Sequence, residues 1–317
     1  MRAFSVPILV IGFNRPHFTI QIISKLRTIA PKELFFAVDG PRRNRIDDIA
    51  KCAAVRDAIN LVDWKCDVQT LFRSENLGCK NGVQSAITWF FDHVQEGIIL
   101  EDDCIPTESF FTFAEEILKR HRKNDQIMHI NGCRLLCAWK KEESSYLFGR
   151  YPHVWGWATW KRAWQKYDIQ MSDFPEFLAS KRIHSIYDRL KPRIFWNYTL
   201  MKMHSSPMDT WDIQWLFTIW NNDGIVVHPK VNMVSNIGYG EDATHTHDLS
   251  RKPSDFNVQE FEMPWIHPSE VIVNRAFDNA LFFKEHPRYD ILQMWKHYLS
   301  VVRWRWRVNG QRTARSI

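Results

Sequence analysis

The sequence predicts an α/β protein built on a mainly parallel sheet with helices on its flanks. Over the first hundred residues, short continuous apolar runs alternate with longer stretches that carry apolar residues at helical spacing. This alternation is the pattern of βαβ units, in which a helix connects two parallel strands. The remainder is rich in tryptophan and ends in a basic, aromatic stretch. We therefore expect a less regular second half and a helical C-terminal tail.

The periodicity places the individual elements in chain order. Short apolar runs predict buried strands at 6–13, 34–38, 68–72 and 98–100. Apolar positions that recur every three or four residues predict amphipathic helices at 17–30, 46–61, 82–94 and 107–121. Right-handed crossovers would bring the carboxyl ends of these strands to one edge of the sheet.

Polar side chains follow each predicted strand. Arg15 comes after the first strand, Asp39 after the second and Arg73 after the third, while three consecutive acids end the fourth. Ligands of α/β proteins bind beyond the carboxyl ends of the strands. A single polar strand end is more often a mere turn. Together these strand ends favour a nucleotide site.

The three acids are Glu101, Asp102 and Asp103. Crowded carboxylates repel one another unless a cation or hydrogen-bond donors hold them. Their hard oxygens suit Mn²⁺ or Mg²⁺, with substrate phosphates and water completing the coordination. The simpler alternative is a solvated acidic turn before the next helix. Neither a G-x-G-x-x-G nor a P-loop motif is present, so phosphates would be held by metal and arginine.

The second half carries an isolated acid among tryptophans. Asp212 lies in the aromatic stretch 211–220, and its partial removal from water would suit it to act as a general base. The alternative is an acid that stabilises a helix N-terminus, with Asp209 as its cap. Trp157 and Trp211 are candidates for a sugar-stacking floor, although most such tryptophans pack in cores.

Two further segments carry candidate functions. The glycine-bearing stretch 236–247 reads as a loop over an active site, and its His245 or His247 could touch metal or diphosphate. The tail at 289–307 mixes aromatic and basic residues, as in a helix that lies on a membrane surface. A C-terminal helix that docks on the domain is an equal alternative for this tail.

Bulk properties narrow the class of protein. The 317 residues carry a net charge of +6, but much of the excess lies in the last fifteen residues, so nucleic acid is not an expected partner. No apolar run reaches membrane-spanning length, no signal peptide is evident, and the six cysteines lack zinc spacing. We expect a cytoplasmic protein, peripheral on the inner face of the plasma membrane if the tail binds lipid.

These motifs, in this order, resemble the nucleotide-sugar glycosyltransferases of the GT-A fold, over roughly residues 6–247. The most similar pattern is that of the N-acetylglucosaminyltransferase that begins complex N-glycans and its bacterial relatives. The resemblance implies that Asp103 is the direct metal ligand, Asp102 binds the ribose and Glu101 binds the donor sugar. It also implies a loop over the diphosphate near 242–247, which contains His245.

The same resemblance extends to the remaining site residues. It implies that Asp39 reads the uracil edge, that Arg15 contacts the nucleotide and that Asp212 is the catalytic base. Arg73 completes the expected donor site along the sheet edge. An adjacent second acid of the family is Ile213 here, and a family histidine has no counterpart near residue 82, which leaves the donor sugar open.

We therefore expect a metal-dependent inverting glycosyltransferase, a hexosyl- or N-acetylhexosaminyl-transferase. It would move a sugar from a nucleoside-diphosphate sugar, with UDP the expected nucleotide, to a hydroxyl of a glycan or glycolipid. The expected organisation is a donor half at 1–135, an acceptor and catalytic half at 136–250, and a C-terminal extension at 251–317. The alternatives are a nucleotidyltransferase on sugar phosphates and a non-catalytic membrane-peripheral carbohydrate-binding protein.

Overall fold

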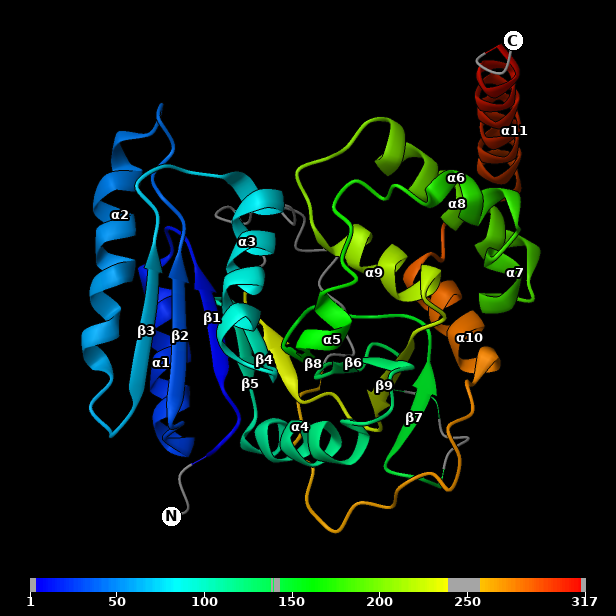
Figure 1. The fold of residues 1–317 in the computed structure, drawn as a ribbon. Helices are drawn as coiled ribbons and strands as arrows, with labels where there is room; N and C mark the ends of the chain where they lie inside the picture. Colours follow the sequence, from blue (N-terminus) through cyan, green and yellow to red (C-terminus); the bar gives the residue numbers. More distant parts are fainter. Residues whose placement is uncertain (1–3, 138, 140–142, 239–256, 315–317) are drawn as a thin grey trace.

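The computed structural model describes residues 4–137, 139, 143–238 and 257–314. Their framework is one eight-stranded sheet in the order β3-β2-β1-β4-β8-β6-β9-β7 (Figure 1). In chain order its strands are β1 (Ile8–Gly12), β2 (Glu33–Val38), β3 (Asp67–Phe72), β4 (Glu96–Glu101), β6 (Ile127–Asn131), β7 (Tyr146–Gly149), β8 (Trp157–Trp160) and β9 (Ile225–Pro229). Only β8 and β7 are antiparallel to their neighbours in this sheet. The predicted α/β class, with a mainly parallel, Rossmann-like sheet, is confirmed.

The first half follows the predicted alternation closely. Helices α1 (Pro16–Ile29), α2 (Ile46–Asp57) and α3 (Gly78–His93) follow β1, β2 and β3 respectively, and α4 (Glu108–His121) comes after β4 and a short strand at Cys104–Pro106. Two boundaries differ from the prediction by more than two residues. A short 3-10 helix, η1 (Ala58–Leu61), ends the second helical stretch, and α3 begins four residues early, at Gly78, whose φ of 77° suits glycine.

The sheet separates two hydrophobic layers because successive strand residues point to opposite faces. Leu9, Phe35 and Ile99 belong to the layer that contains α3 and the helices of the second half. The alternate strand residues, such as Val10 and Phe36, pack with α1, α2 and α4. Helices therefore cover both faces, as the buried apolar strands require.

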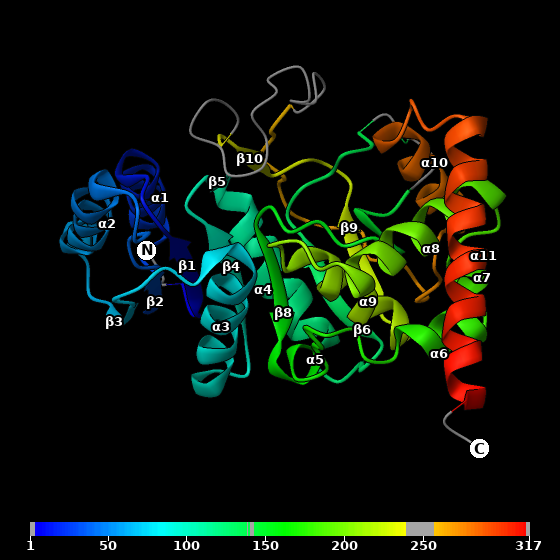
Figure 2. The same cartoon turned by 90° about the horizontal axis from the view of Figure 1, so that it is seen from above.

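The second half completes the same sheet and adds a helical layer. Its helices are α5 (Lys161–Trp164), α6 (Phe174–Ala179), α7 (Ile183–Ile186), α8 (Leu190–Ser205), α9 (Asp212–Asn221), α10 (Arg275–Glu285) and α11 (Ile291–Ala314). Helix α11 packs along α8, at the end of the molecule opposite α1 and α2 (Figure 2). Among the described residues, no helix is long and apolar enough to cross a bilayer.

A small ribbon outside the main sheet brings two distant segments together. Strand β5 (Cys104–Pro106) directly follows the acidic run, and it pairs antiparallel with β10 (Val234–Asn236). The stretch that was expected to lie over the active site therefore starts beside the acids.

Candidate active site

A cavity of about 740 Å³ lies beyond the carboxyl ends of β1, β2, β3 and β4. Its size is in the range of roughly 300–1,000 Å³ that is typical of small-molecule sites. Arg15, Asp39, Arg73, Glu101 and Asp102 all line it. The structure thus brings the predicted strand-end residues together at one edge, because parallel strands end on the same side of the sheet.

The guanidinium of Arg15 holds two of the clustered acids. Its Nη1 lies 2.9 Å from Asp103 Oδ2, and its Nη2 donates to Asp102 Oδ1. Burial raises the pKa of Glu101 to about 8, and the neighbouring charge of Asp103 adds to this effect. Burial likewise raises the pKa of Asp102 to about 7 against the opposing charge of Arg15. One guanidinium therefore holds two of three crowded carboxyl groups, and the raised pKa values show that the cluster would be stabilised by a further positive charge.

Asp103 is placed differently from its two neighbours. It is not among the described residues that line the cavity, because Arg15 occupies Oδ2 and Gly238 packs against the same atom. A Cβ at position 238 would lie 2.0 Å from Asp103 Oδ2, so only glycine fits. The other oxygen, Oδ1, has the Cys104 thiol at 3.5 Å. The backbone N–H of Ile237 donates to the Asp103 carbonyl at 2.9 Å, which fixes the start of the 236–247 stretch.

The acids provide a donor set that suits a divalent cation. Asp102 Oδ2 is buried without a hydrogen-bond partner among the described residues, and Asp103 Oδ1 has only a weak thiol contact there. No three His, Cys, Asp or Glu side chains converge as a ready-made metal cage in the described part of the chain. Mg²⁺ sites commonly use one or two carboxylates and take water and phosphate as further ligands, so this arrangement fits such an ion.

Asp39 organises the loop that follows β3. Its carboxylate accepts hydrogen bonds from Gly40 N at 2.9 Å, Asn76 Nδ2 at 2.9 Å and Leu77 N at 3.0 Å. Burial raises the pKa of Asp39 in spite of these donors. A Cβ on Gly40 would lie 2.4 Å from the backbone carbon of Glu75, so this glycine permits the close approach of the two loops. Asp39 therefore has a structural role, because it holds the loop that forms one wall of the cavity.

A basic rim on the cavity was only partly visible in the sequence. Arg42 lines the cavity and holds Asp48 through Nε at 2.6 Å and Nη2 at 2.9 Å. Those hydrogen bonds hold the pKa of Asp48 far below its usual range. Arg45 and Lys51 also line this side. An alternation of basic and acidic residues over 42–51 was the available signal, but it did not distinguish a cavity rim from a solvated helix end.

Asp209 caps a different helix from the one that the structural alternative for Asp212 implied. It was considered as a cap for the helix that contains Asp212. Instead, its carboxylate accepts from Cys79 N at 3.1 Å and Lys80 N at 2.8 Å, at the N-terminus of α3. The N-cap of α9 is Trp211, which makes no side-chain capping bond. Asp209 thus ties the chain before α9 to the rim of the large cavity.

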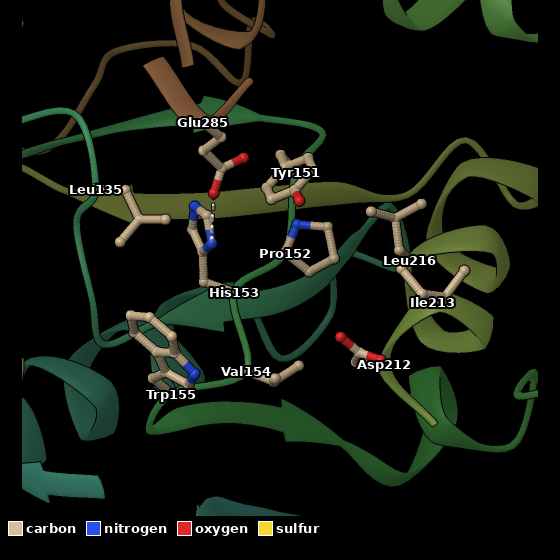
Figure 3. A pocket seen from close by; sticks show the side chains of 10 residues that line it. All are labelled: Leu135, Tyr151, Pro152, His153, Val154, Trp155, Asp212, Ile213, Leu216 and Glu285. Atoms are coloured by element: carbon tan, nitrogen blue, oxygen red, sulfur yellow. Dashed lines mark ion pairs between the residues drawn. The ribbon is translucent and has the colours of Figure 1, made fainter. Parts of the chain in front are cut away.

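Asp212 begins α9 and lines a second cavity, whereas Asp209, three residues earlier, lines the large one. Thr210 Oγ1 donates to its carboxylate. Its charge contributes to the raised pKa of Glu101 and of Cys79, both of which line the large cavity. Asp212 itself lines the second cavity (Figure 3). The candidate base is therefore close to the acidic cluster but faces a separate space.

Trp157 and Trp211 do not form a sugar-stacking floor, which corrects the expectation for both. Their relative exposures are 0% and 2%, so neither ring offers a face to a ligand. Trp157 stacks on His129 at 4.8 Å and on Trp211 at 5.7 Å. Trp157 lies on a central strand whose faces are both covered, and burial of such large rings stabilises the core. His245 and His247 lie outside the described residues.

The second cavity, of about 170 Å³, lies between the β7–β8 connection, α9 and the end of α10. Figure 3 shows Asp212 on one side and the Glu285 carboxylate above the His153 ring on the other. His153 Nδ1 lies 3.8 Å from Glu285 Oε1. Burial raises the pKa of Glu285 to about 8 and lowers the pKa of His153 to about 3. Both groups are therefore neutral near pH 7.

A pH dependence of stability follows from Glu285. Burial raises its pKa from the ordinary value of 4.5 to about 8, so the folded protein keeps a proton that the unfolded chain releases. The resulting stabilisation is complete below about pH 4 and is lost as the pH rises through about 8. Between pH 6 and 8 the free energy of unfolding of the wild type should fall by roughly 1–3 kcal/mol more than that of Glu285→Gln. Urea denaturation at both pH values measures this, with exposed Glu270→Gln as the control; parallel curves for wild type and Glu285→Gln contradict it.

Comparisons with known proteins add the following. No protein-family model matches the chain, and no curated protein matches it in sequence. The structure is similar to apo mouse xyloside xylosyltransferase 1, with 10% identity over 68% of this chain and 81% of that chain, and a TM-score of 0.34. It is also similar to 4-diphosphocytidyl-2C-methyl-D-erythritol synthase from Anaerococcus prevotii DSM 20548, with 11% identity, coverage of 70% and 87%, and a TM-score of 0.31. With both TM-scores below 0.5, neither structure decides the activity of this chain.

Proposed function

We propose that the protein is a metal-dependent inverting glycosyltransferase. It would transfer a hexosyl or N-acetylhexosaminyl group from a nucleoside-diphosphate sugar, with UDP the expected nucleotide, to a hydroxyl of a glycan or glycolipid. The observation that carries this proposal is the convergence of Arg15, Asp39, Arg73, Glu101 and Asp102 on one cavity, which Asp209, three residues before Asp212, also lines. A solvated acidic turn would require neither the basic residues that line the cavity nor a further carboxylate at Asp212.

The large cavity is the proposed donor site. Its basic residues, Arg15, Arg42 and Arg73, would attract the diphosphate, because guanidinium groups bind phosphate oxygens in a bidentate manner. Asp39 would face the base, Asp102 the ribose and Glu101 the sugar, as the resemblance to GT-A enzymes implies. The described cavity volume of about 740 Å³ is adequate for such a ligand.

Mn²⁺ or Mg²⁺ is the proposed cofactor, held by Asp103 with Asp102 adjacent. When bound, such an ion supplies positive charge that stabilises the departing diphosphate. Arg15 neutralises part of the same cluster in this structure, so it competes with any cation for Asp103 Oδ2. Donor phosphates offer Arg15 an alternative partner, which favours loading of donor and cation together.

Asp212 is the proposed general base. It would accept the proton of the acceptor hydroxyl as that oxygen attacks the anomeric carbon from the face opposite the diphosphate. The bond from the anomeric carbon to the diphosphate oxygen breaks, and the diphosphate leaves as a stabilised anion. A single carboxylate is therefore enough, and no general acid is needed. The place of Asp212 in the second cavity, three residues after Asp209 in the large one, supports this role over a purely structural one.

Peripheral membrane contact through α11 is also proposed. Met294, Val301 and Trp304 pack α11 against the core. This face of α11 therefore fits the alternative of a C-terminal helix that docks on the domain. An opposite stripe is exposed at helical spacing, and it consists of Ile291, Leu292, Trp295, Tyr298, Leu299 and Trp306. Lys296 and Arg303 are exposed on the same helix. Exposed aromatic and aliphatic side chains beside basic ones suit an anionic lipid surface.

Donor binding should depend on a cation and on Asp103. In a thermal-shift screen with UDP-sugars, one donor at about 100 times its dissociation constant should stabilise the wild type by about 2.7 kcal/mol. The shift should require Mn²⁺ and should vanish in Asp103→Ala. Asp188→Ala, an exposed acid far from the cavity, is the control. An unchanged donor shift in Asp103→Ala would remove the metal assignment.

Asp212→Asn should separate binding from turnover. The variant should keep the Mn²⁺-dependent donor shift and lose about 10²–10⁴-fold in kcat, because it cannot accept the proton. UDP release measures turnover. The matched control is Asp223→Asn at the other end of α9, where φ is 50° and asparagine is well tolerated. Wild-type turnover in Asp212→Asn is the result that rules out its role as the base.

Outward-facing residues of α11 should govern vesicle binding. Leu292→Ser combined with Trp295→Ser should weaken co-sedimentation with phosphatidylserine vesicles at least about tenfold, because each substitution removes apolar area from the interface. High salt should weaken binding by the wild type. Ile49→Ser, which alters an exposed apolar residue at the opposite end of the molecule, is the control. Equal binding by all variants speaks against a lipid-facing helix.

A further inference from the structure

The second cavity is assembled from segments that are distant in sequence. Residues 151–155 form one wall, the first turn of α9 forms another, and Glu285, the last residue of α10, forms the far end. None of these residues belongs to the donor cavity. The arrangement therefore provides a separate binding space. We call the part that Asp212 lines its near end, and the part that Glu285 and His153 line its far end.

We propose that this cavity binds one neutral, hydroxyl-bearing sugar unit of the acceptor, with Asp212 at its near end and the Glu285–His153 pair at its far end. This inference rests on the proposed function, because it assigns the acceptor side of the same reaction. It names Glu285 and His153 as acceptor-binding residues and Asp212 as the group that meets the attacking hydroxyl.

Unsatisfied polar atoms at the far end support a ligand. His153 is only 8% exposed, and its Nε2 has no hydrogen-bond partner among the described residues. Glu285 Oε2 makes no hydrogen bond of good geometry there either, although the Tyr151 hydroxyl interacts with this carboxyl and partly opposes the rise of its pKa. The 3.8 Å between His153 Nδ1 and Glu285 Oε1 is too long for a hydrogen bond. Each buried polar atom left unpaired costs about 1–3 kcal/mol. Hydroxyl groups of a sugar both donate and accept, so they can satisfy the imidazole and the carboxyl together.

The charge of the lining selects a neutral ligand. No lysine or arginine is found among the described residues that line this cavity, so a phosphate or carboxylate would find no full positive charge there. The protonated Glu285 and the neutral His153 offer no full charge to an ammonium group at the far end, and the Asp212 carboxylate at the near end is the group that meets the attacking hydroxyl. Uncharged hydroxyls match this environment.

The size and walls of the cavity suit a single ring. Its volume of about 170 Å³ is below the roughly 300–1,000 Å³ of pockets that hold drug-sized ligands. Pro152, Ile213 and Leu216 provide apolar walls on either side (Figure 3). Sugar C–H groups can pack on such walls while the hydroxyls reach the polar ends. Asp212 follows Asp209, which lines the donor cavity, by three residues, so the ring would bind beside the donor cavity.

Saturation-transfer NMR on the full chain tests this inference with methyl glycosides. The neutral probes are the methyl glycosides of glucose, galactose and mannose; the charged probes are those of glucosamine and glucuronic acid. At least one neutral glycoside should bind the wild type more strongly than either charged one. Binding should weaken at least tenfold in Glu285→Ala and in Ile213→Trp, which fills the cavity but leaves Glu285 intact. Glu285→Gln, an uncharged isostere, and exposed Glu270→Ala should both retain it.

Several results would overturn the inference. The first is that no neutral glycoside binds, and the second is that a charged glycoside binds more strongly than every neutral one. The third is that Glu285→Gln loses binding, and the fourth is that Glu285→Ala and Ile213→Trp both bind as the wild type does. The UDP-sugar thermal shift, measured on the same preparations, keeps this outcome separate from the proposed function. A donor shift without glycoside binding rejects the acceptor site alone, whereas glycoside binding without a donor shift rejects the transferase.

Discussion

The ion pairs of Arg15 are the constraint on which the site depends. Two strands, β1 and β4, deliver one guanidinium and three carboxylates to the same edge, and burial there raises the pKa of Glu101 and Asp102. A cluster with fewer cations than acids keeps an affinity for positive charge. The same guanidinium also has an affinity for phosphate. Both requirements of a sugar-nucleotide site, a place for a cation and a place for a diphosphate, therefore arise from one arrangement.

The segment between Asp209 and Asp212 links the two cavities. Asp209 holds the N-terminus of α3 at the rim of the large cavity, and three residues later Asp212 faces the smaller one. Proximity of a base to a reacting centre is a large part of catalysis, since misplacement by an ångström is costly. This short segment, anchored through Asp209, positions the candidate base relative to the proposed donor site.

The local pattern of the sequence predicted the first half well and the second half poorly. Strand ends with polar residues could be placed at one edge because βαβ connections have a fixed hand. Trp157 and Trp211 could not be assigned, since burial depends on contacts between segments far apart in sequence. Asp209 was assigned to the nearer helix because its true partner lies 130 residues away. The sequence around Glu285 contains no motif that indicates a functional role. Only the packing of α10 beside residues 151–153 brings this side chain to a cavity.

The pairing of β4 with β8 has a mechanical consequence. The strands of the proposed donor half and those of the proposed acceptor half form one hydrogen-bonded sheet, so the two halves of the molecule cannot swing apart about a hinge as separate domains do. Entry and exit of substrates then depend on small displacements of side chains and connecting segments around an essentially stiff frame. Turnover would be limited by local gating, and the distance between the two cavities would stay constant throughout the cycle.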